Sequence, residues 1–360
     1  RADDLPRCCG PCAAVALFNQ AVNSPSFGGG FKGTLRGGAP LTTLVAVSDS
    51  RQTAWLNVLC EDRLPILADS AREEPVWIKP LERGATVQAS GIGWKRGLLW
   101  QPARIELQWS DQPGRCPACG ETTQPLVTGF ITEKFNYTLK GNWPHPHGPR
   151  KWKKSGNTVK EYFDSFTTTA PSWTHLTEML VAIEEEKEGN TPAAVVRQYR
   201  DLCRAQPLQL MVGGYRNNQA TIEERRHERI SLSRGWQDNL PHLRQMIELA
   251  LEVKDALRRK SGGFGKEIGA PGLPFRAQAL YYQQSESIVH ETLRRIDWRE
   301  YAAFRASFVR QLAETARRVF DQLTAPYSHS LQMIQALVKA RRGLDEALRK
   351  LIREASEAST

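Results

Sequence analysis

The sequence predicts an α+β fold. An irregular mixed α/β domain with a four-cysteine zinc site spans residues 1–228, and a C-terminal antiparallel four-helix bundle spans residues 229–360. Between about residues 28 and 166 the chain is rich in Gly, Pro, Trp and Thr, with short alternating apolar stretches typical of strands. After about residue 229, Gly and Pro are confined to joints and apolar residues recur at helical spacing. The 360 residues suffice for two domains of ordinary size.

In the first domain the pattern predicts helices over residues 13–21, 172–188 and 191–204. Pro171-Ser172 precedes the second of these and Gly189-Asn190 closes it. Half-buried strands are expected where apolar residues alternate between residues 128 and 139. In the second domain, four amphipathic helices are marked by apolar stripes that begin at Leu243, about Pro274, Phe304 and Leu331. The first ends at residues 260–263. Short connections between long helices favour an antiparallel bundle.

The composition excludes several classes of protein. A content of 40% hydrophobic and 24% charged residues is that of a folded globular protein. No run approaches the roughly 18 consecutive apolar residues of a membrane helix, and the first residues lack the order of a signal peptide. We therefore expect a cytoplasmic protein without membrane contact. The net charge, 49 − 39 = +10, makes a polyanion such as nucleic acid a plausible partner. The Lys/Arg clusters of the bundle are either a solvated face or a phosphate-facing surface.

Seven cysteines, an odd number spread over a large chain, are not the pattern of a secreted disulfide scaffold. Two Cys-x-x-Cys pairs stand out, Cys9/Cys12 and Cys116/Cys119, and together they supply four soft ligands for tetrahedral Zn²⁺. Cys8 is an alternative to Cys9. Two other interpretations of these pairs remain open: one pair is a redox-active Cys-x-x-Cys, or the thiols are simply buried. Because the chain starts at Arg1 with a cysteine cluster close behind, it is expected to be a fragment.

No catalytic motif emerges: the sequence has no G-x-S-x-G elbow, Walker loop or His-Glu-x-x-His. His145 and His147, set between prolines, are more typical of a packed rigid loop than of a metal site. Three features instead suit contact with a DNA duplex: the glycines at 28–30, Lys134 and Gln219. The glycines allow close backbone approach, Lys134 points outward from an alternating pattern, and Gln219 follows turn residues (Gly-Gly and Asn-Asn) near an exposed tip. Taken singly, each also fits a solvated loop.

Several segments carry a resemblance to a known family. In order along the chain they are FNQAVNSPSFGGGFKGTLRGGAPLTTLV, WIKP, GLLWQPARIEL, TGFITEKFNYTLKGNWPHPH, FTTTAPSWT, AAVVRQYR and GGYRNNQATIEERRH. They resemble the CasA (Cse1) family, the large subunit of the type I-E CRISPR surveillance complex Cascade of prokaryotes. The resemblance covers essentially the whole chain, weakest in the bundle, and family members carry a further N-terminal portion.

The resemblance implies a non-catalytic subunit that recognises the protospacer-adjacent motif (PAM) of double-stranded DNA from the minor groove and starts strand separation. Its partners would be the target DNA, the 5′ end of the guide RNA (crRNA), the other Cascade subunits and a helicase-nuclease that docks on it. Minor-groove readout is permissive, since A·T and T·A pairs present nearly the same acceptors there. The competing hypothesis is a zinc-stabilised scaffold that binds RNA and protein subunits without reading DNA. A more remote hypothesis is an enzyme, a thiol-disulfide oxidoreductase that uses Cys9 and Cys12.

The resemblance also implies roles for single residues. The family's glycine loop falls on Ser26, Phe27, Gly28 and Gly29, where Ser26 departs from a family glycine. The lysine finger falls on Lys134, and the glutamine wedge on Gln219 with Asn218 beside it. A lysine pair that grips the DNA backbone corresponds to Lys153 and Lys154. The zinc ligands fall on Cys9, Cys12, Cys116 and Cys119.

Overall fold

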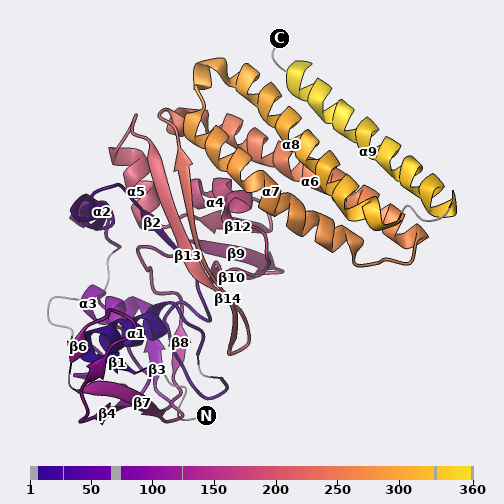
Figure 1. Ribbon diagram of the computed structural model, residues 1–360. Helices are drawn as coiled ribbons and strands as arrows, with labels where there is room; N and C mark the ends of the chain where they lie inside the picture. The colour runs from indigo at the N-terminus through magenta and orange to yellow at the C-terminus, as the bar shows by residue number, and fades with distance from the viewer. Residues whose placement is uncertain (1–6, 27, 66–73, 124, 328–330, 358–360) are drawn as a thin grey trace.

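A computed structural model describes residues 7–26, 28–65, 74–123, 125–327 and 331–357. It has three parts in a row: an N-terminal lobe, a central layer of sheets, and a bundle of long helices (Figure 1). The predicted α+β class, with mixed structure first and helices last, is confirmed. The long hairpin β13–β14 belongs to the central layer, and its closed end reaches toward the N-terminal lobe (Figure 1).

The N-terminal lobe is built from short elements. A three-stranded antiparallel sheet has the order β1-β7-β4, a parallel pair joins β3 to β8, and β5–β6 form a small hairpin. Its apolar core holds two fully buried tryptophans, Trp100 and Trp143. The elements are β1 (Cys8–Cys9), α1 (Gly10–Val22), β3 (Thr86–Gln88), α3 (Trp94–Leu98), β4 (Ile105–Ser110), β5 (Gly114–Arg115), β6 (Thr122–Thr123), β7 (Leu126–Thr132) and β8 (Thr138–Lys140).

The central layer contains two antiparallel sheets. One has the strand order β14-β13-β2 and the other β10-β9-β12-β11. Three short helices, α2, α4 and α5, accompany them (Figure 1). The elements are β2 (Thr42–Val45), α2 (Ser50–Leu56), β9 (Arg150–Ser155), β10 (Thr158–Phe163), α4 (Leu176–Leu180), β11 (Ile183–Glu184), β12 (Glu188–Thr191), α5 (Ala194–Leu202), β13 (Leu208–Asn218) and β14 (Thr221–Leu232).

The bundle consists of α6 (Leu240–Glu267), α7 (Leu273–Arg295), α8 (Tyr301–Thr324) and α9 (Leu331–Glu357). Each helix packs against the next, and α9 also packs against α6, so the predicted four-helix arrangement is confirmed. The bundle and the central layer share one continuous apolar core, in which Trp173 contacts Tyr282 edge to face. The predicted division at 228/229 falls within β14 and stays a prediction.

Three local predictions were wrong. The helix expected over 172–188 stops at Leu180, because the Asn190 side chain accepts the Ile183 N–H and donates to the carbonyls of Glu178 and Val181, which fixes the next residues as strands. The first bundle helix does not end at 260–263 but continues to Glu267, since Phe264 is buried in the core. Gly213 and Gly214 are not turn residues; they lie inside strand β13.

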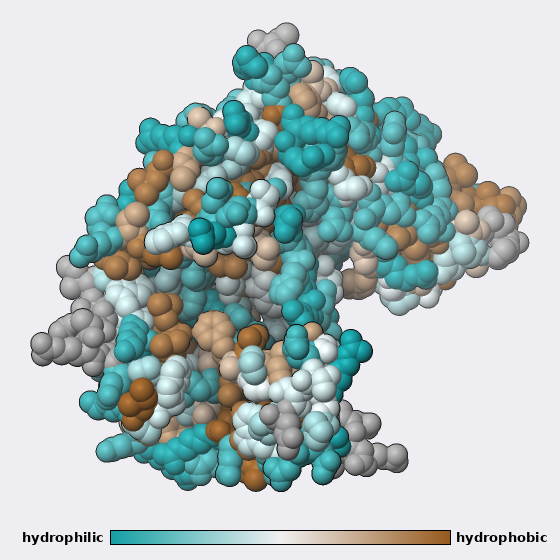
Figure 2. Space-filling model, turned by 60° about the vertical axis from the view of Figure 1, so that its left-hand side comes forward, coloured by the Kyte–Doolittle hydropathy of each residue, from teal (hydrophilic) through white to brown (hydrophobic). Residues whose placement is uncertain are grey.

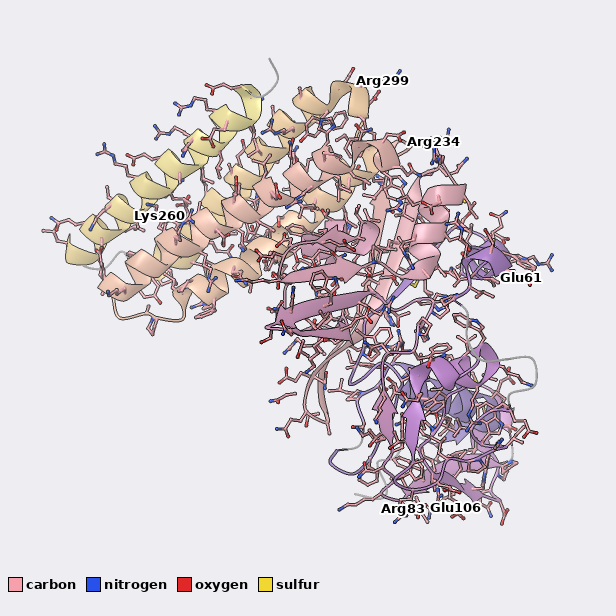
Figure 3. All side chains as sticks on the ribbon, turned by 180° about the vertical axis from the view of Figure 1, so that it is seen from behind. Glu61, Arg83, Glu106, Arg234, Lys260 and Arg299 are labelled. Atoms are coloured by element: carbon pink, nitrogen blue, oxygen red, sulfur yellow. The ribbon has the colours of Figure 1, made fainter. Side chains whose placement is uncertain are left out.

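The surface is largely hydrophilic. Figure 2 shows hydrophilic side chains over most of the visible bundle, with an apolar patch at its far end. Helix α9 exposes the apolar side chains of Leu331 and Val338. Charged side chains project from every part of the molecule, among them Arg83 and Glu106 at the far end of the N-terminal lobe (Figure 3). Of the helices that the structure describes, none combines the length and apolar character needed to cross a membrane.

Candidate nucleic-acid interface and metal centre

Four cysteines meet in the N-terminal lobe. Cys9 precedes helix α1 and Cys12 lies in its first turn, where Gly10 and Pro11 begin the helix. Cys116 and Cys119 come from the turn between β5 and β6. That turn is closed by hydrogen bonds from Cys116 N–H to the Glu121 carbonyl (2.7 Å) and from Gly120 N–H to the Cys116 carbonyl (2.8 Å). Gly120 has φ +81°, which glycine adopts without strain.

The sulfur geometry suits a metal ion. The Sγ atoms of Cys9, Cys12, Cys116 and Cys119 all lie within 4.8 Å of one another, and those of Cys9 and Cys119 are 3.7 Å apart. Tetrahedral zinc with Zn–S bonds of about 2.3 Å has sulfurs about 3.8 Å apart. Cys8 is outside this group, so of the two alternatives the structure brings Cys9 to the centre. These four residues could hold a metal ion.

The electrostatics of the centre favour a thiolate at one of its four cysteines. A hydrogen bond with the Cys9 thiol raises the pKa of Cys12, whereas the pKa of Cys116 shifts the other way. Hydrogen bonds from the backbone N–H of Cys9, and then of Cys119, lower the pKa of the Cys116 thiol to about 6. At neutral pH Cys116 is therefore mostly ionised, which is the form that binds metals. The two pairs are more than 100 residues apart in the sequence, so a bound ion would fasten the start of α1 to the β5–β6 hairpin.

A second site forms where the glycine segment, Gly28–Gly30, meets Lys134. The Phe135 N–H donates to the Gly30 carbonyl (2.9 Å), and the Lys32 N–H donates to the Phe135 carbonyl (3.0 Å). A Cβ atom on Gly30 would lie 3.3 Å from Cδ of Lys134, so the lysine stem crosses directly over this glycine. Lys134 is exposed, as the alternating pattern predicts, while Phe135 is buried.

The hairpin tip, Asn218–Ala220, reaches the same place. A Cβ atom on Gly28 would lie 4.0 Å from Cβ of Ala220. Gln219 is exposed at the turn with φ +53°, a left-handed conformation, and its carbonyl accepts a hydrogen bond from Asn217 Nδ2 (2.6 Å). The structure therefore brings together three segments that are distant in the sequence. Phe27 lies outside the described residues, and Ser26 is half-buried beside Gly33.

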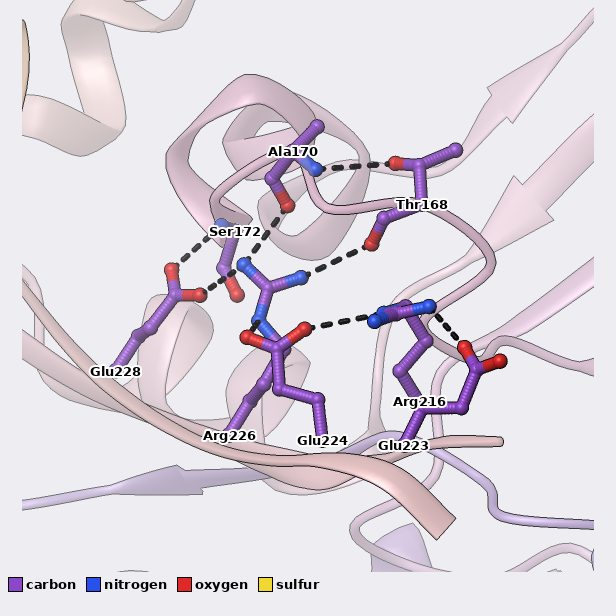
Figure 4. A network of polar contacts seen from close by, with 8 residues as sticks. All are labelled: Thr168, Ala170, Ser172, Arg216, Glu223, Glu224, Arg226 and Glu228. Carbon is purple, nitrogen blue, oxygen red and sulfur yellow. Dashed lines mark hydrogen bonds and ion pairs between the residues drawn. The ribbon is translucent and has the colours of Figure 1, made fainter. Parts of the chain in front are cut away.

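The stem of the hairpin is stiffened by an ionic network (Figure 4). Arg226, which is 7% exposed, donates to Glu228 Oε1 (2.6 Å) and to the carbonyls of Thr168 and Ala170. It also lies over the Phe166 ring. Arg216 pairs with Glu223 and Glu224 nearer the tip. Removing one partner of a buried ion pair typically costs about 3–5 kcal/mol, so this network fixes the direction of the stem.

The other predicted residues lie apart from this meeting point. Lys153 and Lys154 are exposed on strand β9, where Lys153 pairs with Glu188 (3.3 Å). His145 and His147 are packed as expected: His147 N–H donates to His145 Nδ1, and its Nε2 lies 3.0 Å from the Asn57 carbonyl. Burial lowers the pKa of both imidazoles.

Sequence reasoning missed the residue that shapes the glycine loop. Arg36 is 4% exposed, and its Nη2 donates to the Val22 carbonyl (2.9 Å), Asn23 Oδ1 (2.9 Å) and Thr42 Oγ1 (3.0 Å). One guanidinium thus fastens the end of α1 to strand β2, on both sides of the glycines. A lone Arg between Leu35 and Gly37 carries no local signal of this role.

Comparisons with known proteins show a family and a fold. The family described as CRISPR-associated protein Cse1 matches residues 1–319. The fold is similar to that of Cse1 from Thermobifida fusca, with TM-score 0.70 and 16% identity over 98% of this chain and 72% of that one. Cse1 from Acidimicrobium ferrooxidans gives TM-score 0.65 and 15% identity over 88% and 65%.

A chain of a CRISPR RNA-guided surveillance complex is also similar, with TM-score 0.54 and 15% identity over 86% of this chain and 61% of that one. The present chain thus spans 61–72% of the lengths of these three relatives.

Proposed function

This chain belongs to the Cse1 family of CRISPR-associated proteins, and we propose that it is the non-catalytic subunit of a crRNA-guided surveillance complex that recognises the PAM in double-stranded DNA. It contacts the motif from the minor groove and opens the duplex beside it, so that the guide RNA can pair with the target strand.

One observation carries the proposal: the glycine segment, Lys134 and the hairpin tip form a single exposed surface. The segments meet through the contacts of Gly30 with Lys134 and of Gly28 with Ala220. Each segment alone fits a solvated loop. Their convergence supports a shared ligand. The Lys134 ammonium, the glycine backbone and the Gln219 side chain can then contact the same DNA molecule.

The chemistry of these groups suits the minor groove. The Lys134 ammonium donates hydrogen bonds to the O2 and N3 acceptors of A·T pairs. The glycine segment has no side chains, so its backbone can come close to the base edges even where the guanine amino group projects into the minor groove. Gln219 is long and uncharged, so it enters the base step beside the motif. Unstacking a step costs a few kcal/mol, which pairing with the guide offsets. Lys153 and Lys154, together with Asn218 at the tip, add contacts to the DNA.

The four-cysteine centre holds structural Zn²⁺ in this proposal. Thiolates in two Cys-x-x-Cys pairs are the donor set that zinc prefers, and the sulfur distances fit tetrahedral coordination. Zinc here supplies a crosslink and no chemistry. Cys9, Cys12, Cys116 and Cys119 hold the N-terminal lobe together, and that lobe carries Lys134.

We propose three further partners: the other subunits of the complex, the 5′ end of the crRNA and a helicase-nuclease that docks on this subunit. The family match and the similarity to a chain of a CRISPR RNA-guided surveillance complex support the first of these. The protein acts in the cytoplasm of a prokaryote, where the nucleic acid is.

The wedge role is tested with Gln219→Ala. The variant is assembled with guide RNA and the other subunits, and binding is measured on a duplex target and on a target with a pre-opened bubble. We expect duplex binding to fall roughly tenfold or more while bubble binding is kept, because only the duplex must be unstacked. Gln108→Ala, an exposed glutamine on β4, is the matched control and should change neither. Equal loss on both targets would rule out the wedge. Duplex binding indifferent to the motif would favour the scaffold hypothesis.

A further inference from the structure

Strand β14 carries two different faces. Glu224, Arg226 and Glu228 point toward residues 168–172 and form the network of Figure 4. Successive residues of a strand point to opposite sides. The alternate residues, Arg225, His227 and Arg229, therefore form a row on the other side of the sheet, and all three are exposed. We call this row the basic face.

The basic face has no internal counter-charge. Within the part of the chain that the structure describes, no ion pair or side-chain hydrogen bond joins Arg225, His227 or Arg229 to another residue. By contrast Arg226, between them, is paired on its own side. Three cationic or polar donors in line along an exposed strand therefore remain available to an anionic ligand.

A hollow of about 170 Å³ lies beside the basic face. Arg225 and His227 line it together with Asn19, Asn23, Tyr215 and the glycines of β13, and none of the described residues that line it is acidic. Gly213 keeps it open, because a Cβ atom there would come within 2.9 Å of Cδ2 of His227. Asn19 Nδ2 donates to the Tyr215 hydroxyl (2.8 Å), which holds the aromatic ring in place.

The hollow is too small for a free small molecule of ordinary size, whose pockets measure about 300–1,000 Å³. It suits one group of a polymer, a phosphate or a base. Cationic grooves with an aromatic side chain are typical of proteins that bind single-stranded nucleic acid.

The basic face lies a short way up the stem from the hairpin tip. Tyr215 precedes Gln219 by four residues, so it lies about 13 Å up the stem at about 3.3 Å per residue. A duplex that ends at Gln219 does not extend beyond the tip, whereas a separated strand does.

We infer that the basic face, with the hollow at Tyr215, binds the backbone of one DNA strand after it has separated at Gln219. This inference rests on the proposed function, because it takes the hairpin tip as the point of opening. It gives the hairpin a second role, since the tip separates the strands and the stem holds one of them, which opposes re-annealing.

The test uses the double variant Arg225→Gln/Arg229→Gln. Binding of a fluorescent single-stranded DNA to the chain is measured by anisotropy over a series of salt concentrations. We expect binding roughly tenfold weaker, and a slope of log K against log salt smaller by about 1.4, since each lost phosphate contact on a single strand removes about 0.7.

The control is Arg276→Gln/Arg310→Gln, which removes the same charge from exposed positions on α7 and α8. It should leave affinity and slope nearly unchanged, and thermal melting verifies that both double variants fold. An equal loss in both would show a general charge effect and overturn the inference. The inference would also be overturned if unlabelled duplex DNA, or RNA of the same sequence, competed more strongly than unlabelled single-stranded DNA.

Two further measurements separate this inference from the proposed function. Photocrosslinking with 5-bromodeoxyuridine in the single strand should modify Tyr215 or His227, and crosslinks confined to the bundle would contradict the inference. On a pre-opened bubble, Gln219→Ala should keep binding while Arg225→Gln/Arg229→Gln loses it. If duplex binding proves indifferent to the motif, the proposed function fails, yet the loss on single strands would still support the basic face.

Discussion

At the scale of single residues, the three glycines of the glycine segment are not equivalent. Gly28 has φ +117° and faces Ala220, and Gly30 has φ +90° and lies under the Lys134 stem. Gly29 has an ordinary φ, and nothing lies within 4 Å of the place where its Cβ would be. Only the first and third therefore need to be glycine for the backbone conformation.

This difference gives a prediction. Gly28→Ala should strain the loop by about 1–3 kcal/mol and displace it from the hairpin tip, because L side chains rarely adopt its φ. Motif-dependent duplex binding should fall, with little change in global melting. Gly29→Ala is the control for conformation and should fold equally well. Its effect on binding measures contact with DNA alone. If Gly28→Ala binds and discriminates as the unchanged protein does, the loop conformation has no part in recognition.

Gln219 shows what local sequence patterns can and cannot predict. Turn residues before it predicted an exposed tip, and it is exposed there. Its left-handed backbone was not predictable, because glutamine has no preference for it. Strained backbone of this kind tends to occur at functional positions. Arg36 was missed altogether, since its hydrogen-bond partners are brought to it only by tertiary contacts.

At the scale of elements, periodicity predicted the helices well where burial is regular. Helices α7, α8 and α9 begin close to the predicted residues, because each buries one continuous stripe. Residues 172–188 looked helical too, but Asn190 ends that helix through hydrogen bonds that only the folded chain provides. The strands were hardest to predict, because several contain only two to four residues.

The four-cysteine centre is, in the proposed function, the element-scale feature that holds the N-terminal lobe together. We predict that metal analysis finds about one zinc per chain, and that Cys116→Ser loses it and lowers Tm by roughly 5–10 °C. Cys60→Ser is the control, since Cys60 is an exposed free cysteine outside the group of four. It should keep both metal and Tm. A Cys116→Ser protein of unchanged Tm, or a wild-type chain free of zinc, would contradict a structural zinc site.

At the scale of the whole molecule, the candidate interface depends on contacts across most of the chain. Gly28 and Ala220 are 220 − 28 = 192 residues apart and yet adjacent. Local patterns predicted each part of the interface but not the assembly, which needs the N-terminal lobe, β2 and the hairpin packed together. The stem network and Arg36 provide that packing.

Charge is also arranged at this scale. Many of the basic side chains that give the net charge of +10 are paired, for example Arg317 and Arg341 with Asp345. In the proposed function, unpaired cations such as those of the basic face contact phosphates. Specific recognition is proposed to rest on few groups: the glycine segment, Lys134 and Gln219.

The most direct test of recognition is a motif library. The chain, assembled with guide RNA and the other subunits, is offered duplex targets that differ only at the motif, and binding to each is ranked for three proteins: wild type, Lys134→Ala and Lys140→Ala. Lys140 is an exposed lysine on β8 of the same lobe. We predict that Lys134→Ala reduces the ratio of affinities for correct and incorrect motifs roughly tenfold, which corresponds to about 1.4 kcal/mol of lost discrimination. Lys140→Ala should preserve the wild-type ranking. A ranking unchanged by Lys134→Ala would contradict the assignment of this surface to motif recognition.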